Sequence, residues 1–291
     1  MDLFDRVMVL GAGGMLGRQV VSELKRRGRD FCAFGHSEVD IAADDAVRSA
    51  FDRVGPTLVF NCAAFTRVDD CEAAPDRAMS INGEAPGALA RLAAETNALL
   101  VHISSDYVFP GTGRRPYRED DPTAPDDVLS AYGRTKLEGD RRILASGCRH
   151  LIARTSWVYG PGGPNFVDTI TRAAGSQPEL KVVDDQRGRP TYTVDLAAGI
   201  FSLLDRGAEG VVNVANDGEC TWYDFACEIL RLQSIPTPVR PCTTQEFPRP
   251  ARRPAFSVLD LSRFQSIVGQ PLRTWREAVG AHLRAHEAPE G

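Results

Sequence analysis

The chain has 291 residues, of which 43% are hydrophobic, and it carries 34 Lys and Arg against 39 Asp and Glu, for a net charge of −5. This length and apolar content exclude a disordered protein and allow one large domain or two smaller ones. The negative charge argues against nucleic acid as the main partner, because a protein that binds the phosphate backbone usually presents a basic face.

The first residues and the cysteines predict a soluble, cytoplasmic protein. The N-terminal stretch lacks the basic start and long hydrophobic region of a secretory signal, and no stretch approaches the roughly 20 apolar residues that span a bilayer. The chain has seven cysteines but no C-x-x-C pair, which fits neither a disulfide framework nor a zinc motif. Such cysteine usage is typical of a reducing compartment.

Strands and helices alternate through the first half of the chain. The apolar run at 7–10 is followed by glycines and by a helical pattern that closes on Gly28. The alternation continues with strands predicted at 30–35, 57–64 and 99–105, and with helices predicted at 44–55 and 86–97. This rhythm predicts right-handed crossover units and an α/β fold, a Rossmann-type doubly wound parallel sheet buried on both faces.

The pattern changes after the strand at 99–105. A loop rich in Pro, Gly and charge follows, and we expect its residues 110–127 to close over a ligand, because so long a loop inside a compact domain is usually functional. A helix around 131–140 and a buried strand at 150–160 come next. From residue 160 onward Pro and Gly are frequent, which predicts a smaller C-terminal lobe. One helix near 194–206 is expected to return to the sheet.

A glycine turn joins the first strand to the first helix. Gly11, Gly14 and Gly17 stand in a G-x-x-G-x-x-G spacing, with Gly13 as an extra glycine. A backbone without Cβ atoms can approach a pyrophosphate closely, and the helix N-terminus offers free N–H groups. A purely structural turn is the alternative, but the position on the first strand of the series makes this a dinucleotide-binding signal.

The residues around this turn also bear on which dinucleotide binds. Met15 and Leu16 begin the helix, and Arg18 follows where it can face a 2′-phosphate. The tip of the second strand, residues 35–37, has no carboxylate before Glu38 to bind the ribose 2′-hydroxyl of NAD. The sequence therefore favours NADPH, with NADH as the alternative, and a solvated Arg18 is the rival interpretation.

A tyrosine, a lysine and a serine form the second constellation. Tyr132 and Lys136 lie four residues apart in a predicted helix and so share a face. A nearby ammonium favours the phenolate and lowers the tyrosine pKa from its usual value near ~10. Ser105, with Ser104 beside it, ends a strand where the ligand crevice of such a sheet lies, and its hydroxyl can stabilise developing negative charge. A surface tyrosine beside a solvated lysine is the alternative for the pair alone.

With these three elements in this order, the chain resembles the extended short-chain dehydrogenase/reductases. Within them it resembles the family of dTDP-4-dehydrorhamnose reductases, through segments found along nearly its whole length. The segments are NCAAFTRVDDCE, SSDYVFPGTGRRPYREDD, AYGRTKLEGD, RTSWVYG, DDQRGRPT, TWYDFA and RRPAFSVLD.

The resemblance implies a reaction and a division of labour. NAD(P)H would reduce the C4 keto group of dTDP-4-dehydro-β-L-rhamnose to give dTDP-L-rhamnose, the last step of dTDP-rhamnose synthesis. Tyr132 would donate the proton, with Ser105 beside it, and Lys136 would hold the nicotinamide ribose and lower the tyrosine pKa. Residues 1–159 would be the NAD(P)-binding domain and 160–291 mainly the substrate-binding lobe.

The resemblance also implies further binding residues. The turn after the third strand matches a cofactor contact of the family at Ala64, Phe65 and Thr66. The stretch near the adenine is matched by Asp40 and Ile41. Three residues match the lining of the sugar pocket, namely Asp106, Tyr107 and Trp157, although Trp157 as a core residue and Asp106 as a turn cap are alternatives. Some members bind magnesium through clustered acidic residues; no such cluster matches here, so we predict no metal.

Arginines are expected to meet the diphosphate of the sugar nucleotide, because guanidinium groups bind phosphate oxygens well. The candidates are Arg187, Arg189, Arg252 and Arg253, each with a solvated surface role as its alternative. The expected partner is thus a small dTDP-sugar, with neither nucleic acid nor membrane involved, and a homodimer is an open option.

Other functions share much of this pattern. An epimerase or another nucleotide-sugar 4-ketoreductase would have the same fold, and the non-catalytic beta subunit of methionine adenosyltransferase also resembles this family. Asp106 is followed by Tyr107 rather than by a second carboxylate, which argues against a dehydratase. The complete Ser105, Tyr132 and Lys136 set favours a catalyst over a regulator.

Overall fold

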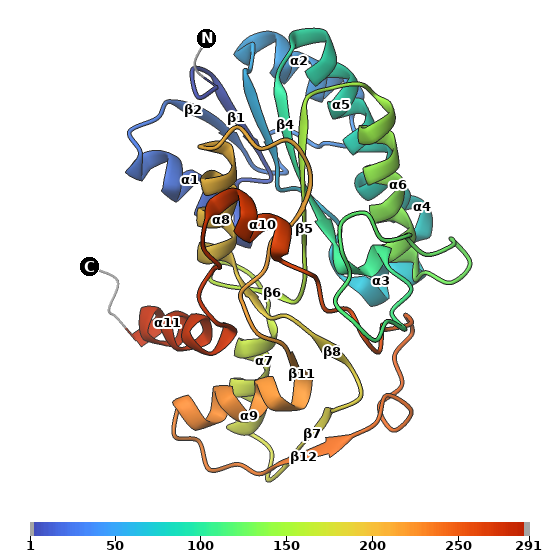
Figure 1. Cartoon of the computed structure of the whole chain (residues 1–291), viewed down its shortest axis with the longest axis vertical. Helices are drawn as coiled ribbons and strands as arrows, with labels where there is room; N and C mark the ends of the chain where they lie inside the picture. The colour runs from blue at the N-terminus through green and yellow to red at the C-terminus, as the bar shows by residue number, and fades with distance from the viewer. Residues whose placement is uncertain (1–2, 288–291) are drawn as a thin grey trace.

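The computed structural model describes residues 3–287, and a six-stranded sheet forms its larger part (Figure 1). The strand order is β10-β5-β4-β3-β1-β2, and every neighbouring pair is parallel. The strands are β1 (Val7–Leu10), β2 (Phe31–Phe34), β3 (Leu58–Asn61), β4 (Leu99–Ser105), β5 (His150–Thr155) and β10 (Gly210–Asn213). The order runs outward in both directions from β1, which confirms the predicted doubly wound sheet.

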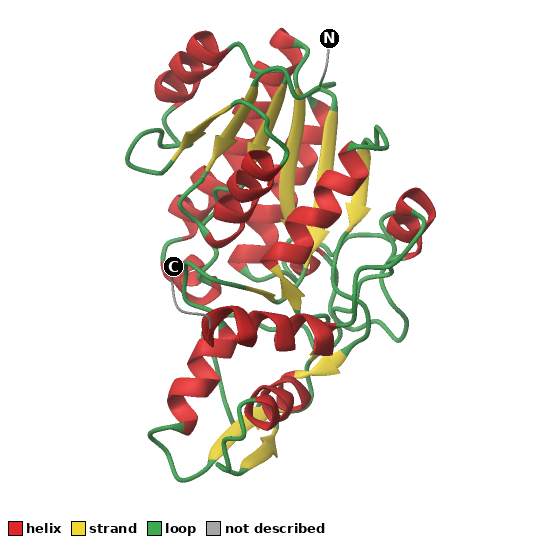
Figure 2. Ribbon diagram, turned by 90° about the vertical axis from the view of Figure 1, so that its left-hand side faces the viewer, coloured by secondary structure: helices red, strands yellow, loops and turns green. Residues whose placement is uncertain are grey.

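Helices cover both faces of this sheet (Figures 1 and 2). One face is covered by α1 (Met15–Arg26), α8 (Thr193–Leu204) and α10 (Ser262–Val268). The other face is covered by α2 (Asp44–Val54), α5 (Ala85–Thr96) and α6 (Ala131–Ala145). Alternate residues of each strand supply the two cores: in β1, Val7 and Val9 face α1 and α8, whereas Met8 and Leu10 face α2 and α5.

Three segments from beyond residue 160 complete this domain, namely α8, α10 and strand β10. Helix α8 packs beside α1 through Leu196, Ile200 and Phe201, which are fully buried. Strand β10 pairs with β5 and extends the sheet. Residues 210–213 contain only a short apolar run beside a glycine, which is too short to predict a strand from the sequence. Strand β10 is therefore known only from the structure.

A smaller lobe lies below the carboxyl ends of the strands (Figure 2). Its helices are α7 (Phe166–Ala174), α9 (Trp222–Leu232) and α11 (Trp275–Glu287). Its strands pair as β6 (Val158–Tyr159) with β9 (Thr191–Tyr192), β7 (Leu180–Val183) with β12 (Val239–Cys242), and β8 (Arg187–Gly188) with β11 (Cys220–Thr221). Aromatic side chains, among them Tyr159, Phe225 and Trp275, fill a core separate from the cores of the sheet.

Four short helical segments surround the carboxyl edge of the sheet: α3 (Val68–Ala73), α4 (Pro75–Met79), the π-helical turn η1 (Ser80–Glu84) and the 3₁₀ turn η2 (Asp106–Val108). Within residues 3–287, no helix is both long enough and apolar enough to cross a membrane. The seven cysteines are all free thiols.

The loop at 110–127 is tied to a segment near the C-terminus. The amide of Tyr117 donates to the carbonyl of Val258 over 2.8 Å, and the amide of Phe256 donates to Gly111 over 2.9 Å. The ring of Tyr117 also stacks on Phe109 with centroids 4.6 Å apart. Closure of this loop stays a prediction, and the bonds imply that any such movement would involve residues 256–260 as well.

Candidate active site

The glycine turn packs directly against the turn that follows β3. Gly11 has φ +72°, and a Cβ there would lie 2.6 Å from the amide nitrogen of Ala63. A Cβ on Gly17 would overlap the Gly11 carbonyl oxygen, whereas one on Gly13 would meet nothing within 4 Å. Gly11 and Gly17 are therefore required by the close approach of backbone segments, while Gly13 leaves the outer side of the turn open.

The N-terminus of α1 opens onto this turn. Gly14 caps the helix in an extended conformation with no side-chain cap, so the first amides, beginning at Met15 and Leu16, lack intrahelical partners. Such amides and the helix dipole attract a phosphate group. The turn and the helix start therefore fit the diphosphate of a dinucleotide, as the sequence spacing indicated.

Arg18 is exposed beside the glycine turn. Its Nε donates to the carbonyl of Gly13 over 2.9 Å. A Cβ on Gly162 would lie 2.7 Å from the Arg18 Cδ, and one on Gly163 would lie 2.8 Å from the Met15 Cγ. Met15 and Arg18 therefore line the junction between the glycine turn and the loop after β6.

The tip of β2 has its own hydrogen bonds. The Glu38 carboxylate accepts from the amide of Gly35 over 2.8 Å, so this acid is turned back onto the backbone. Asp40 is exposed and accepts from the amide of Ala42, whereas Ile41 is a core residue. A cofactor contact with Ile41 would therefore involve its backbone.

The turn after β3 is held by an asparagine that the sequence did not single out. Asn82, 1% exposed in η1, accepts from the amide of Phe65 over 2.8 Å and donates to the Phe65 carbonyl over 2.9 Å. Phe65 packs, as Tyr132 does, against the small cluster of Cys71, Ala78 and Ala131, and Ala64 and Thr66 flank Phe65. π-Helical turns are rare and are frequently found at functional sites. The π-helical turn at 80–84 therefore marks Asn82 as a functional candidate, but this signal lies in the backbone and not in the sequence.

The structure brings Ser105 and Tyr132 together at the carboxyl edge of the sheet. Ser105 ends β4 and donates its hydroxyl hydrogen to Asp106 over 2.9 Å, while it accepts from the amide of Tyr107 over 3.1 Å. The rings of Tyr107 and Tyr132 meet edge to face, with centroids 5.4 Å apart. The hydroxyl expected to donate to a substrate oxygen is thus already engaged with a carboxylate.

Burial sets the protonation of these groups. It raises the pKa of Tyr132 above its usual value of 10.0, and a hydrogen bond with Ser105 offsets only part of this rise. Burial also raises the pKa of Asp106 to about 6. Tyr132 is therefore a protonated phenol at neutral pH.

Lys136 occupies the same face of α6 as Tyr132 but points into the sheet. Its Nζ donates to the carbonyl of Ile103 over 2.6 Å and lies 3.3 Å from the Nε2 of His102. Burial lowers the pKa of Lys136 to about 8, in spite of the attraction of Asp140. The sequence led us to expect that Lys136 lowers the tyrosine pKa. In this structure Tyr132 keeps part of its surface exposed, Lys136 is buried, and desolvation is the main influence on the pKa of Tyr132 and raises it.

A cavity of about 690 Å³ lies between this site and the smaller lobe. Its apolar wall is formed by Phe166, Ile170 and Trp222, and Tyr107 lines the cavity on the side of Ser105. The volume is that of a pocket for a small organic ligand.

Charged and polar side chains also line this cavity. Arg253 lies within it and pairs with Asp69, with Nη2 and Oδ1 separated by 3.0 Å. Arg249, Lys181 and Gln186 are further lining residues that the sequence reasoning missed. The arginine-rich run at 249–253 could have indicated Arg249, but nothing in the local pattern indicates Lys181.

Two of the predicted diphosphate arginines have other partners. Arg187 pairs with Glu219 over 3.2 Å. Arg189 donates to the carbonyls of Leu259 and Gly218, over 2.8 and 2.9 Å, and so connects segments of the lobe. Of the four candidates, Arg253 is the one that lines the large cavity.

Trp157 lies behind the cavity wall. Its ring stacks on Trp222 with centroids 3.6 Å apart, and it is Trp222 that lines the cavity. Trp157 has φ +47°, and a Cβ on Gly188 would lie 2.6 Å from its Nε1. Trp157 is half-buried, and its contact with the sugar stays a prediction.

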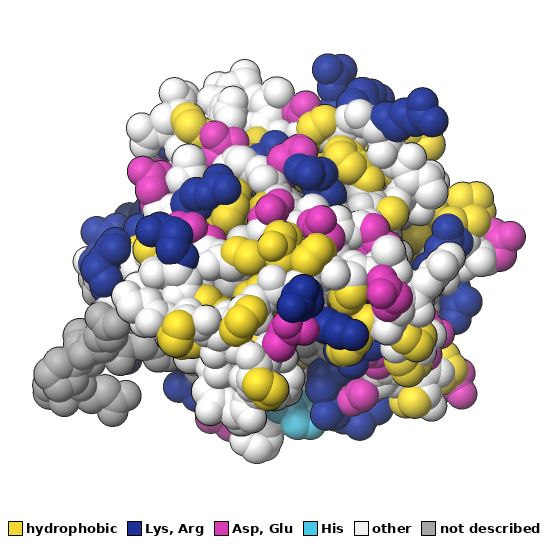
Figure 3. Space-filling model, turned by 90° about the horizontal axis from the view of Figure 1, so that it is seen from below, with side chains coloured by type: hydrophobic (Ala, Val, Ile, Leu, Met, Phe, Trp, Pro, Cys, Tyr) yellow, Lys and Arg dark blue, Asp and Glu magenta, His cyan; other side chains and the backbone are white. Residues whose placement is uncertain are grey.

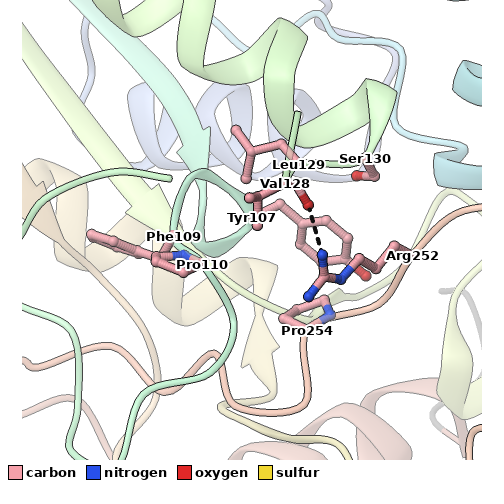
Figure 4. Close-up of a pocket in the computed structure, with 8 residues that line it drawn as sticks. All are labelled: Tyr107, Phe109, Pro110, Val128, Leu129, Ser130, Arg252 and Pro254. Atoms are coloured by element: carbon pink, nitrogen blue, oxygen red, sulfur yellow. Dashed lines mark hydrogen bonds between the residues drawn. The ribbon is translucent and has the colours of Figure 1, made fainter. Parts of the chain in front are cut away.

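A second, small hollow of about 20 Å³ adjoins Tyr107 (Figure 4). Tyr107, Ser130 and Pro254 line it, and Arg252 closes it by donating to the carbonyl of Val128 over 3.3 Å. Arg252 therefore joins the C-terminal segment to the loop before α6.

The surface around the lower lobe has no single sign of charge. Seen from below, basic and acidic side chains are intermixed with hydrophobic ones (Figure 3). Among residues 3–287, no three His, Cys, Asp or Glu side chains are arranged to hold a metal ion.

The doubly wound sheet, the glycine turn and the serine, tyrosine and lysine at its edge define an NAD(P)-type oxidoreductase of the extended short-chain class. The model of the RmlD substrate binding domain matches residues 5–287, and the chain belongs to this family.

Named relatives agree with this assignment. The dTDP-4-dehydrorhamnose reductase of Streptomyces griseus is 45% identical over 281 residues, covering 94% of this chain and 91% of the relative. A probable dTDP-4,6-dihydroxy-2-methyloxan-3-one 4-ketoreductase of Streptomyces antibioticus is 44% identical over 277 residues, covering 94% and 93%. The crystal structure of dTDP-4-dehydrorhamnose reductase from Bacillus anthracis, in complex with NADP, is 33% identical, with a TM-score of 0.92 over 97% of this chain and 99% of that one.

Proposed function

We propose that this chain is a dTDP-4-dehydrorhamnose reductase, which uses NADPH to reduce the C4 keto group of dTDP-4-dehydro-β-L-rhamnose and forms dTDP-L-rhamnose. The observation that carries the proposal is the meeting of Ser105 and Tyr132 at the carboxyl edge of the sheet, beside the turn that packs on Gly11. The relatives of known name support the choice of sugar nucleotide.

The cofactor site is formed by backbone. The amides at the start of α1, after Gly14, would hold the diphosphate, and the turn at 64–66 would lie along the nicotinamide side. When bound, the reduced nicotinamide supplies the hydride for the keto carbon.

Tyr132 donates the proton in this proposal. Because burial keeps its pKa high, the phenol is protonated at neutral pH and suits the role of an acid better than that of a base. Ser105 accepts a hydrogen bond from the amide of Tyr107 and donates to Asp106, so it fixes the position of the groups around the reacting oxygen.

The sugar nucleotide would occupy the cavity between the domain and the lobe. Arg253 and Arg249 are placed to meet the diphosphate, and the ring of Trp222 offers a face for an aromatic base. We infer that the residues beyond 160, apart from α8, β10 and α10, form the lobe that binds substrate.

A second function is another dTDP-sugar 4-ketoreductase with a different product configuration. It is favoured by the 44% identity to the probable 4-ketoreductase of Streptomyces antibioticus, which is close to the value for the reductase of Streptomyces griseus. The two enzymes would share every residue argued above and differ in how the cavity orients the sugar.

The test is oxidation of NADPH, and separately of NADH, by the purified protein with dTDP-4-dehydro-L-rhamnose generated in the same tube. We expect consumption of NADPH with dTDP-L-rhamnose as product. Consumption only with another dTDP-4-keto sugar would select the second function. Failure with both, although NADPH binds, would reject the proposed substrate and leave another keto sugar or a non-catalytic role.

Location and assembly complete the proposal. We infer a cytoplasmic enzyme, because the seven free thiols suit a reducing compartment. A homodimer is the assembly we propose, and light scattering at micromolar concentration would test it.

A further inference from the structure

A strap of chain joins the smaller lobe to the edge of the sheet beside the large cavity. The strap consists of residues 243–253, which follow β12 and rise from the lobe toward α3 (Figure 1). At its start, Thr244 donates its amide and its hydroxyl hydrogen to the carboxylate of Asp185, over 2.8 and 2.7 Å. Near its end, the amide of Ala251 donates to the Oδ1 of Asp69 in α3 over 3.2 Å. Both ends of the strap are therefore held, one by each half of the protein.

The middle of the strap faces both solvent and the cavity. Residues 245–250 are all exposed. Pro248 and Pro250 each fix one backbone angle, so this stretch has less conformational freedom than an ordinary loop. Phe247 and Arg249 alternate with the two prolines, and both line the cavity. The strap thus presents an aromatic ring and a guanidinium group to the cavity from a stiffened backbone.

The exposure of Phe247 is unusual for an aromatic residue of this protein. Its exposed fraction is 45%, and among residues 3–287 it is the one aromatic residue that is exposed rather than buried or half-buried. A single hydrophobic residue on a surface is common and needs no explanation. This ring, however, lies on the wall of a cavity of about 690 Å³, where a ligand would cover it.

The neighbour of the ring indicates the chemical class of that ligand. The guanidinium carbon of Arg249 lies over the Phe247 ring, 4.6 Å from its centroid. The ring has no polar atom with which to bind sugar hydroxyls or phosphate, whereas its flat face suits another flat ring. An aromatic face beside a guanidinium therefore fits a ligand in which an aromatic base is joined to phosphate.

The opposite end of the cavity fixes how such a ligand would lie. Tyr107 lines the cavity there, and its amide donates to the reaction-side hydroxyl of Ser105 over 3.1 Å. The sugar would lie at this end, because its keto group has to reach Ser105. Four residues separate Arg249 from Arg253, which corresponds to at most about 14 Å of extended chain. The strap can thus follow the diphosphate outward from the sugar to a base beside Phe247.

We propose that Phe247 is a substrate-binding residue that stacks on the base of the sugar nucleotide and covers it on the solvent side. This inference rests on the proposed function for the identity of the ligand. Stacking distinguishes poorly between bases, so Phe247 supplies affinity for the nucleotide rather than the choice of base. Because the strap is anchored at both ends, the ring is in place before the ligand arrives, which reduces the ordering cost of binding.

The test is calorimetric titration of the full chain, saturated with NADPH, by dTDP, UDP and inorganic pyrophosphate. With NADPH bound the glycine turn is occupied, so the added phosphates titrate the cavity. Phe247→Leu keeps an apolar side chain but removes the aromatic face, and at an exposed position it should fold normally. We expect Phe247→Leu to bind dTDP about tenfold more weakly and pyrophosphate as tightly as the wild type does. Phe247→Tyr should keep the affinity for dTDP.

The matched control is Leu232→Ala at the end of α9, because Leu232 is also exposed, at 37%, but does not line the cavity. This variant should bind dTDP as the wild type does. In turnover, Phe247→Leu should raise KM for the sugar nucleotide about tenfold with kcat kept, since the base lies away from the reacting carbon.

The outcomes separate this inference from the proposed function. If Phe247→Leu bound dTDP as tightly as the wild type, the stacking role would be overturned, while the proposed function would stand. An equal loss for pyrophosphate would also overturn it, because the ring would then act on the whole cavity and not on the base. If the wild type bound UDP but not dTDP, and Phe247→Leu lost UDP about tenfold, the stacking role would stand and the dTDP-sugar would be rejected as substrate.

Discussion

Replacement of Gly17 by alanine should weaken cofactor binding, although alanine is the better helix former. Gly17 lies in the first turn of α1, where Gly→Ala would by itself gain about 1 kcal/mol. The new Cβ would overlap the carbonyl oxygen of Gly11 and lie 2.8 Å from the Cα of Ala12, and both are backbone atoms that cannot rotate away. Overpacking of this kind costs about 1–3 kcal/mol, so we expect a net loss of up to about 2 kcal/mol in unfolding free energy.

The same displacement would separate the glycine turn from the amides that face the diphosphate. Since 1.4 kcal/mol corresponds to about tenfold in Kd, NADPH should bind about tenfold more weakly. The control is Gly175→Ala at the end of α7, because a Cβ there would lie 3.6 Å from its nearest neighbour, an ordinary contact, and the position is outside the glycine turn. Calorimetric titration with NADPH and urea denaturation measure the two effects. If Gly17→Ala bound NADPH as tightly as Gly175→Ala, the steric account of this turn would be wrong.

Four further predictions follow from the site. Tyr132→Phe should lower kcat by about 10²- to 10⁴-fold with NADPH affinity kept, and near-normal turnover would remove the tyrosine from its role as acid. Asp106→Asn should be more stable than the wild type above about pH 6 and should lose that advantage below about pH 4. The reason is that folding raises the pKa of Asp106 from 3.8 to about 6. The unfolding free energy of the wild type therefore falls by roughly 3 kcal/mol as pH rises through this window. Urea denaturation across this range checks the sign, and a pH-independent difference would contradict it. Arg253→Ala should raise KM for the sugar nucleotide clearly more than Arg187→Ala does, because only the former lines the cavity; equal effects would place the diphosphate elsewhere. Hydrogen exchange at residues 110–127 should slow when cofactor and substrate are added together, and unchanged protection would argue against loop closure.

Local patterns in the sequence were enough to predict the elements that lie next to each other along the chain. The glycine spacing at 11–17 predicts a strand, a turn and a helix, since each depends on residues within one or two turns of backbone. The four-residue spacing of Tyr132 and Lys136 likewise places both on one face of α6, because the helical repeat alone decides this.

The direction in which a side chain points depended on neighbours far along the chain. Lys136 turns toward Ile103 and His102 because β4 passes behind α6, and Arg187 pairs with Glu219 because β8 and β11 meet in the smaller lobe. Arg249 and Lys181 line the same cavity although they come from a loop and from β7.

The sequence by itself determined the alternation of strands and helices up to residue 105 and the glycine turn, because backbone periodicity and short motifs encode them. The catalytic roles of Ser105, Tyr132 and Lys136 stay predictions. Only the tertiary structure decided that β10 joins the sheet, that Trp222 rather than Trp157 lines the cavity, and that Lys136 is solvated by protein groups instead of water. These outcomes arise from contacts between residues distant in sequence, and burial then changes the protonation of the groups that such contacts enclose.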